Sequence, residues 1–232
     1  MAPVTQATDA DAIEKLVVDA ALAIAAKVGW EQLRLHAIAD RTGLPLAEIG
    51  RHFRDVDAVA NASFSKARVA VLGLPQDELD GRSADERIAV ALAVWLDSLA
   101  PHRRLAGEIL RHKLYNSHPH HWVPMIFDLS RLVHDLLDVA RVAGSGRLRQ
   151  TQEIGLTAIT LLTLAEWLRD DSPGQERSKQ CLRGRLARAG RLARWMSAAA
   201  ERPDPQLPGE PASAPAPPIS APGRRGRSVS QR

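Results

Sequence analysis

Apolar side chains recur at helical spacing along most of the chain, and no segment shows the strict alternation that is typical of strands. The first helical segment, residues 12–28, carries one continuous apolar face and is followed by Gly29, a residue type that commonly ends helices. The same spacing continues, with interruptions, as far as residue 200. This pattern predicts an all-α protein.

Residues 35–53 have the spacing of a helix-turn-helix. Ile38 and the small Ala39 give the first helix an apolar face that a second helix can approach closely. Gly43 follows where a tight turn needs a left-handed backbone, and Pro45 suits the first turn of the next helix because its nitrogen carries no hydrogen. Together with the preceding helix, these two helices predict a compact three-helix unit.

The rest of the chain predicts a helical body followed by a tail. A capping box at Ser83 and Glu86 starts one helix, and Pro101 ends it. A later helix, residues 148–169, is apolar almost all round in its second half, so we expect it in the centre of the body or at a dimer interface. In residues 201–232, prolines fall among alanine, serine and glycine, a composition that predicts disorder.

The segment 16–59 contains the predicted helix-turn-helix and several residues that are typical of one protein family. The residues concerned are Asp19, Ala20, Ala21, Gly29, Trp30, Ile38, Ala39, Gly43, His52 and Phe53. In type and spacing, the segment 16–59 resembles the N-terminal domain of TetR-type transcription regulators. The resemblance implies a DNA-binding helix-turn-helix domain over residues 9–60 and an all-helical ligand-binding and dimerisation domain over residues 61–200. It therefore implies a homodimeric repressor that binds double-stranded DNA and responds to a small apolar ligand.

In this family the second short helix lies in the major groove, so the resemblance implies a DNA interface around that helix. The expected phosphate contacts are Arg34, Arg51, His52 and Arg54. Glu48 is the best candidate for reading a base edge, because a carboxylate accepts a hydrogen bond from the amino group of cytosine. The other expected interface residues, some of them near thymine methyl groups, are Leu44, Pro45, Leu46, Ala47 and Gly50.

The expected DNA interface departs from the family pattern in charge. Leu46, Glu48, Gly50 and Val56 stand where family members usually carry lysine, threonine, tyrosine and a further lysine. Residues 1–60 contain six arginines and lysines against nine aspartates and glutamates. Because phosphate neutralisation supplies most non-specific affinity, a domain that has lost DNA binding is the alternative interpretation.

The resemblance also implies a ligand cavity in the body. Aromatic and methionine side chains of the body are its expected lining: Trp95, Trp122, Met125, Phe127 and Trp167. The same residue types at helical spacing are also common in an ordinary hydrophobic core, and a sequence does not show a void. The sequence therefore leaves both interpretations open.

A second resemblance concerns residues 164–174. This segment looks like the corresponding part of the TetR-like lipid-binding accessory protein of ubiquinone biosynthesis. The last helix adds a basic face, with seven cations between Arg177 and Arg194 against the single Glu176. A basic amphipathic helix can bind an anionic membrane surface or simply expose its arginines to water. The alternative function is thus a lipid-binding accessory protein that no longer binds DNA.

The remaining features predict no catalytic or metal chemistry. His112, His118, His120 and His121 lie close together, but Pro119 interrupts their spacing and no cysteine or carboxylate accompanies them, which favours a polar loop. No nucleophile motif or glycine-rich phosphate loop occurs, so we expect neither an enzyme nor a cofactor.

The location expected from the sequence is the cytoplasm. The chain has one cysteine, and acidic residues near its start do not suit a secretory signal. Its longest apolar stretch, residues 154–168, is shorter than the roughly 20 residues needed to span a bilayer.

Overall fold

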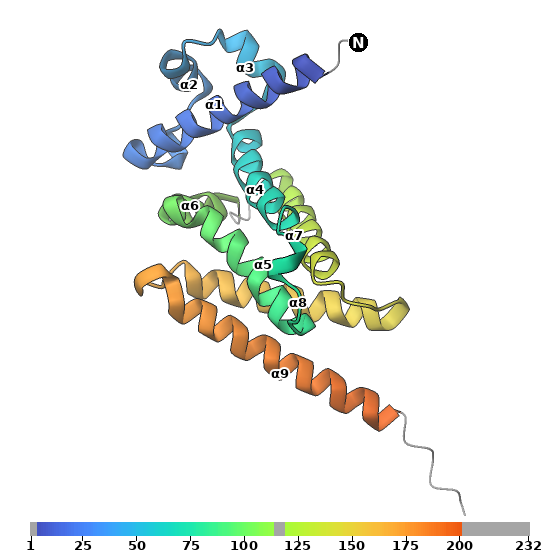
Figure 1. Cartoon of the computed structure of the whole chain (residues 1–232). Helices are drawn as coiled ribbons and strands as arrows, with labels where there is room; N and C mark the ends of the chain where they lie inside the picture. The colour runs from blue at the N-terminus through green and yellow to red at the C-terminus, as the bar shows by residue number, and fades with distance from the viewer. Residues whose placement is uncertain (1–3, 114–118, 201–232) are drawn as a thin grey trace, which may run out of the picture. The chain divides into compact units, whose positions relative to one another are not determined.

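The computed structural model describes the backbone of residues 4–113 and 119–200 and the side chains of residues 9–113 and 125–191. Within these ranges the regular structure is helical and no strand occurs, which confirms the all-α prediction. The α-helices are α1 (Val4–Val28), α2 (Leu35–Thr42), α3 (Leu46–His52), α4 (Val56–Leu72), α5 (Ala84–Leu99), α6 (Arg103–Lys113), α7 (Pro119–Val139), α8 (Gly146–Trp167) and α9 (Glu176–Ala200) (Figure 1).

Helices α2 and α3 form the predicted helix-turn-helix on α1. Ile38 and Ile49 are fully buried where the two short helices meet. Gly43 ends α2 with φ of 75°, a left-handed conformation that a β-carbon would strain, and its N–H donates to the carbonyl of Ala39 at 2.9 Å. Pro45 directly precedes α3. The same local signals that predicted the turn therefore produce it.

Two hydrophobic clusters make up the core, and α4 contributes to both. Val59 and Ala60 of α4 belong to the cluster under α1, α2 and α3, whereas Ala67 and Val71 belong to the cluster of the body. The boundary expected at residue 60 thus lies inside a continuous helix. We call the part formed by α1, α2 and α3 the head, and the part formed by α5 and the later helices the body.

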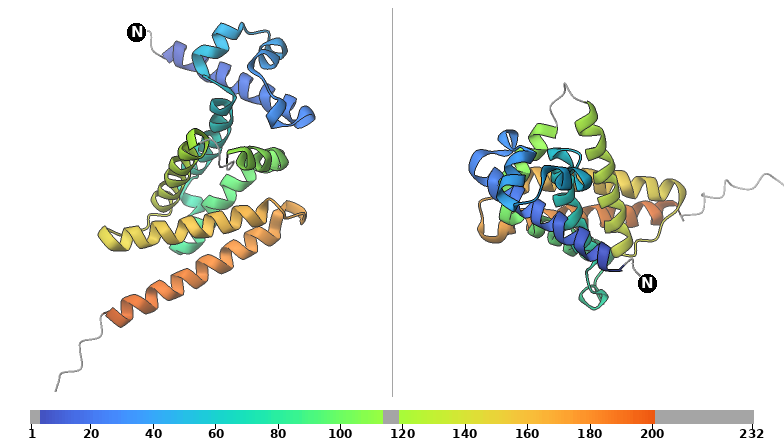
Figure 2. Two further views of the ribbon diagram at one scale, coloured as in Figure 1. Left: turned by 180° about the vertical axis from the view of Figure 1, so that it is seen from behind. Right: turned by 90° about the horizontal axis from the view of Figure 1, so that it is seen from above.

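Helix α8 is buried on one side and apolar on the other. Its inner face packs into the body through Leu156 and Trp167, and the exposed fraction of Ile154 on its outer face is 72%. The other exposed positions of this outer face are Gly155, Ala158, Leu161, Leu162 and Ala165. Helices α8 and α9 follow one another as a helical hairpin (Figure 2).

Asp170 organises the turn between α8 and α9. Its side chain is 3% exposed and accepts hydrogen bonds from the backbone N–H groups of Ser172 at 3.0 Å and Ser178 at 2.8 Å. The hydroxyl of each serine also donates to it. Burial acts to raise the pKa of the carboxyl, but these hydrogen bonds prevail and hold the pKa far below its usual range.

The described residues up to Arg194 form one compact unit, and of the second unit, Trp195–Arg232, the structure describes only the end of α9. The predicted tail, residues 201–232, lies outside the described residues. So do the side chains of three of the four clustered histidines, His118, His120 and His121. Among the helices that are described, none combines the length and the hydropathy needed to cross a membrane.

Candidate DNA interface and ligand cavity

One exposed face of α3 and its flanks carries most of the expected DNA contacts. The exposed members of the set are Arg34, Pro45, Leu46, Ala47, Gly50, Arg51 and Arg54. Leu44 is half-buried against the head core, and the side chains of Glu48 and His52 are 23% and 16% exposed. Residues 46, 47, 50 and 51 recur at helical spacing, so one side of α3 offers a continuous surface to a groove.

Most cations on this surface already have acceptors within the head. Arg51 forms an ion pair with Glu48, and Arg54 donates to Asp55 at 2.8 Å. His52 lies 3.6 Å from the other oxygen of Glu48. Phosphates would have to compete with these carboxylates, so the net charge offered to DNA is lower than the number of cations suggests.

Arg34 lies at the start of α2 rather than on α3. Its guanidinium donates to two backbone carbonyls, those of Glu31 at 2.6 Å and Leu33 at 2.8 Å. These bonds fix the side chain next to the turn but leave its charge without a carboxylate partner among the described residues. Of the three arginines expected to contact phosphates, Arg34 is therefore the one for which no carboxylate in the described part of the chain competes with DNA.

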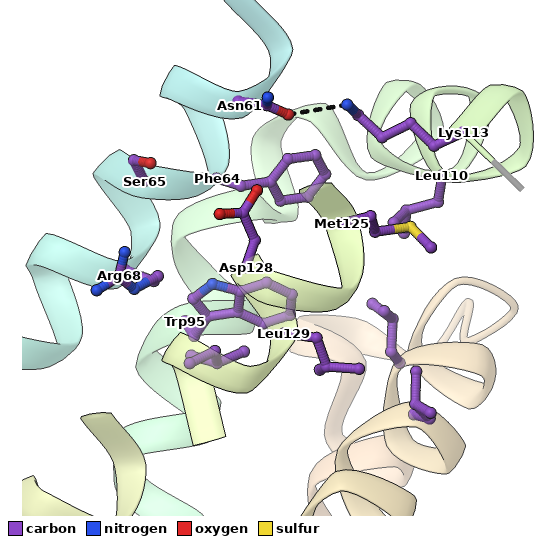
Figure 3. A pocket seen from close by; sticks show the side chains of 13 residues that line it. Asn61, Phe64, Ser65, Arg68, Trp95, Leu110, Lys113, Met125, Asp128 and Leu129 are labelled. Atoms are coloured by element: carbon purple, nitrogen blue, oxygen red, sulfur yellow. Dashed lines mark hydrogen bonds between the residues drawn. The ribbon is translucent and has the colours of Figure 1, made fainter. Parts of the chain in front are cut away.

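A cavity of about 90 Å³ lies between α4, α5, α6, α7 and α8 (Figure 3). Its lining is mainly apolar, and the ring of Phe64 stacks on that of Trp95 with centroids 6.3 Å apart. The other apolar residues are Leu110, Met125, Leu129, Leu132, Leu161 and Leu164. The polar residues are Asn61, Ser65, Arg68, Lys113 and Asp128.

The structure separates the residues expected to line this cavity. Trp95 and Met125 line it. Trp167 is fully buried in the body core and is not part of the lining, and Phe127 is 60% exposed. The side chain of Trp122 lies outside the described residues.

Sequence reasoning missed the polar residues of the cavity. Lys113 is 3% exposed and donates to Asn61 at 2.8 Å, which joins α6 to α4. Burial lowers the pKa of the Lys113 ammonium, and nearby Asp57, Asp128 and Asp55 oppose this shift. No pattern in the sequence marks this site, because a lysine at the end of a helix is usually solvated there.

Helix α6 joins the cavity to the head. Leu110 and Lys113 line the cavity, whereas Leu105 and Ile109 of the same helix belong to the head cluster. Its Glu108 accepts a hydrogen bond from the backbone N–H of Trp30, just after α1, at 3.2 Å. A displacement of α6 at the cavity would therefore act directly on α1 and its surroundings.

Comparison with known proteins yields matches among solved structures. No protein-family model matches the chain, and no curated protein matches it. A TetR transcriptional regulator from Nitrosomonas europaea ATCC 19718 is similar with a TM-score of 0.68 and 32% sequence identity, over 77% of this chain and 98% of that chain. A putative TetR-family transcriptional regulator from Rhodococcus sp. is similar in fold, with a TM-score of 0.54 and 20% identity over 75% of this chain and 96% of its own.

The first of these neighbours is a TetR transcriptional regulator, and the second, at 20% identity, shows a likeness of fold alone. The first of them is matched over nearly its whole length. Sequence identity of 32% over 77% of this chain shows the family, and the helix-turn-helix formed around Gly43, Ile38 and Ile49 agrees with it. The chain belongs to the TetR family of transcriptional regulators.

Proposed function

We propose that this regulator is a dimeric repressor that binds DNA through α3 and releases it when a small apolar ligand occupies the cavity of the body. The observation that carries the proposal is the position of α6. This helix supplies two residues to the cavity lining and two to the head core. A ligand that shifts α6 in the cavity would thus change the packing of α6 against the DNA-binding head.

Dimerisation through α8 fits the same proposal. The outer face of α8 exposes Ile154, Leu161 and Leu162 together with small residues that allow a partner helix to approach. Contiguous apolar surface of this kind is typical of interaction sites. A helix-turn-helix protein usually binds DNA as a dimer, with one half-site for each head. We therefore infer that a second copy of this chain covers the outer face of α8.

The DNA contacts are tested by the salt dependence of binding to a random duplex. In Arg51→Gln, the slope of log K against log salt should become shallower by about 0.9, the contribution of one phosphate contact. In Glu48→Gln, non-specific affinity should rise and the slope should steepen, because Arg51 and His52 lose the carboxylate that competes with phosphate. Fluorescence anisotropy over a series of salt concentrations measures both.

Arg183→Gln is the matched control for this experiment. Arg183 is an exposed arginine of α9 in an ion pair with Glu176 at 2.8 Å, so its replacement removes the same charge away from the head. The control should keep the wild-type slope. If neither Arg51→Gln nor Glu48→Gln changes the slope, α3 does not bind the phosphates and the proposed interface is wrong.

The coupling through α6 is tested without knowledge of the ligand. Leu110→Trp places a larger side chain in the cavity and should lower DNA affinity by about fivefold or more, since the packing of α6 against the head must adjust. Val69→Trp is the control, because Val69 is 65% exposed on α4 and does not line the cavity. A folded Leu110→Trp protein with wild-type DNA affinity would contradict the coupling.

The alternative of a lipid-binding accessory protein finds no support in the comparisons, whose neighbours are transcriptional regulators. The basic face of α9 is also less free than its sequence suggests. Lys179 pairs with Asp97 at 2.7 Å, and Arg185 pairs with Glu166 at 2.7 Å. Arg183 is also paired, with Glu176. These ion pairs reduce the positive charge that α9 could offer to an anionic membrane surface.

A further inference from the structure

Helix α3, which the structure describes in full, exposes one side chain with hydrogen-bonding groups. Its exposed residues are Leu46, Ala47, Gly50 and Arg51, and of these only Arg51 is polar. Ala47 lies four positions before Arg51 on the same face, and Gly50 directly precedes it. The Arg51 side chain is 70% exposed and is much longer than these two neighbours. When α3 enters a major groove, the guanidinium of Arg51 is therefore the group of this face that can donate to a base.

Glu48 is less suited to reading a base than its residue type suggests. Its side chain is 23% exposed, and both of its carboxylate oxygens have a neighbour within the head. One oxygen forms the ion pair with Arg51, and the Nε2 of His52 lies 3.6 Å from the other. The amino group of a cytosine would have to compete with these neighbours for a half-buried acceptor. This arrangement disfavours the cytosine contact that the sequence suggested for Glu48.

The ion pair with Arg51 gives Glu48 a different role. A guanidinium carries several N–H donors in a planar fork, so a contact with one carboxylate oxygen leaves other donors free. Glu48 itself is restricted by His52, which is 16% exposed and whose Nδ1 lies 3.9 Å from a carboxylate oxygen of Glu14 in α1. A carboxylate held in this way limits the directions in which Arg51 can point. The entropy that Arg51 loses when it binds a base is then smaller.

We propose that Arg51 reads a guanine in the major groove and that Glu48 is a positioning residue that holds the guanidinium for this contact. Guanine presents the acceptors O6 and N7 side by side on its major-groove edge, which matches the fork of an arginine, whereas every other base offers at most one acceptor there. The inference rests on the proposed function, because it requires α3 to bind in the groove. On a random duplex, the same charge contributes to the salt dependence described above.

The test starts from a duplex that the full-length wild-type protein has selected from random sequences. In this duplex, each guanine of a half-site is replaced in turn by 7-deazaguanine, together with its equivalent in the other half-site. The replacement removes the N7 acceptor but leaves O6 and the amino group of the paired cytosine unchanged, so a contact between Glu48 and cytosine would not respond. At one guanine, the replacement should weaken wild-type binding by about fivefold or more. Fluorescence anisotropy at constant salt measures both affinities.

Variants assign this discrimination to the two residues. Arg51→Gln should bind the guanine and 7-deazaguanine duplexes within about twofold of one another. Glu48→Gln should reduce the wild-type ratio of the two affinities by about twofold or more, although its affinity for a random duplex rises. A damaged head would lose both. Arg54→Gln is the matched control, because Arg54 is an exposed arginine outside α3 that pairs with Asp55 at 2.8 Å. It should weaken both duplexes by the same factor and keep the wild-type ratio.

Two results would overturn the guanine contact: no guanine at which 7-deazaguanine weakens binding, or wild-type discrimination in Arg51→Gln. Wild-type discrimination in Glu48→Gln would overturn the positioning role. Each of these results requires a selected duplex that the protein binds, so each leaves the proposed function standing. A wild-type protein that selects no sequence at all would instead contradict the proposed function together with this inference. The two failures are thereby distinguished.

Discussion

Replacing both Ile154 and Leu162 with arginine should convert the protein to a monomer and lower its affinity for a selected operator by about a hundredfold or more. These residues are 72% and 56% exposed on the outer face of α8, and neither belongs to the body core or to the cavity lining. A guanidinium buried in an apolar interface without a partner is strongly unfavourable. A monomer binds the operator with one head only and loses the increase in affinity that two linked heads provide, which is commonly about 10²- to 10⁴-fold.

Sedimentation or light scattering measures the mass, and anisotropy measures affinity for a duplex that the wild-type protein has selected from random sequences. Leu72→Arg is the matched control, since Leu72 is a leucine of α4 that is 52% exposed and lies far from α8 in sequence. It should stay dimeric and bind normally. A double variant that remains a dimer would show that another surface makes the interface.

Replacing Asp170 with asparagine should lower the free energy of unfolding by about 3 kcal/mol. The carboxylate accepts hydrogen bonds from the N–H and hydroxyl groups of Ser172 and Ser178, and Ser178 is fully buried. An asparagine amide would turn N–H groups toward these donors and leave some of them unsatisfied. Chemical denaturation at neutral pH measures the loss. Asp171→Asn, a neighbour whose side chain is 90% exposed, should change stability by less than about 0.5 kcal/mol.

Asp170 should also contribute to acid sensitivity. Its folded-state pKa is depressed, so the stability it contributes is fully present above the unfolded pKa of about 3.9 and is lost as the pH falls further toward the folded pKa. Below about pH 4, the unfolding free energy of the wild type should therefore fall more steeply with pH than that of Asp170→Asn. Equal slopes in this range would mean that Asp170 does not carry the effect.

The head was predictable because its signals are local. Gly43, Pro45 and the spacing of Ile38 and Ile49 define a turn and two short helices, and all of these act over a few residues. The apolar pattern predicted α1 from residue 12, whereas the helix begins at Val4. The prediction started too late because the first turns of the helix lack an apolar stripe. The surface of α3 followed from the same helical spacing.

The cavity was only half predictable. Trp95 and Met125 line the cavity as expected, whereas Trp167 is buried in the core outside the lining. The sequence does not separate these two cases, because aromatic side chains at helical spacing occur in both. Lys113 and Asn61 are 52 positions apart and meet only when α6 packs against α4. The pairing of Glu48 with Arg51 and His52 was open to sequence reasoning, since three- and four-residue spacings place side chains together on a helix.

The amino-acid sequence by itself determined the helices, the turn at Gly43 and the family, because backbone preference and apolar periodicity operate within short segments. The tertiary structure alone decided three further features: which face of α8 stays exposed, which polar residues line the cavity, and that α6 joins this cavity to the head. Each of these depends on contacts between distant segments, and such contacts form only when the helices pack.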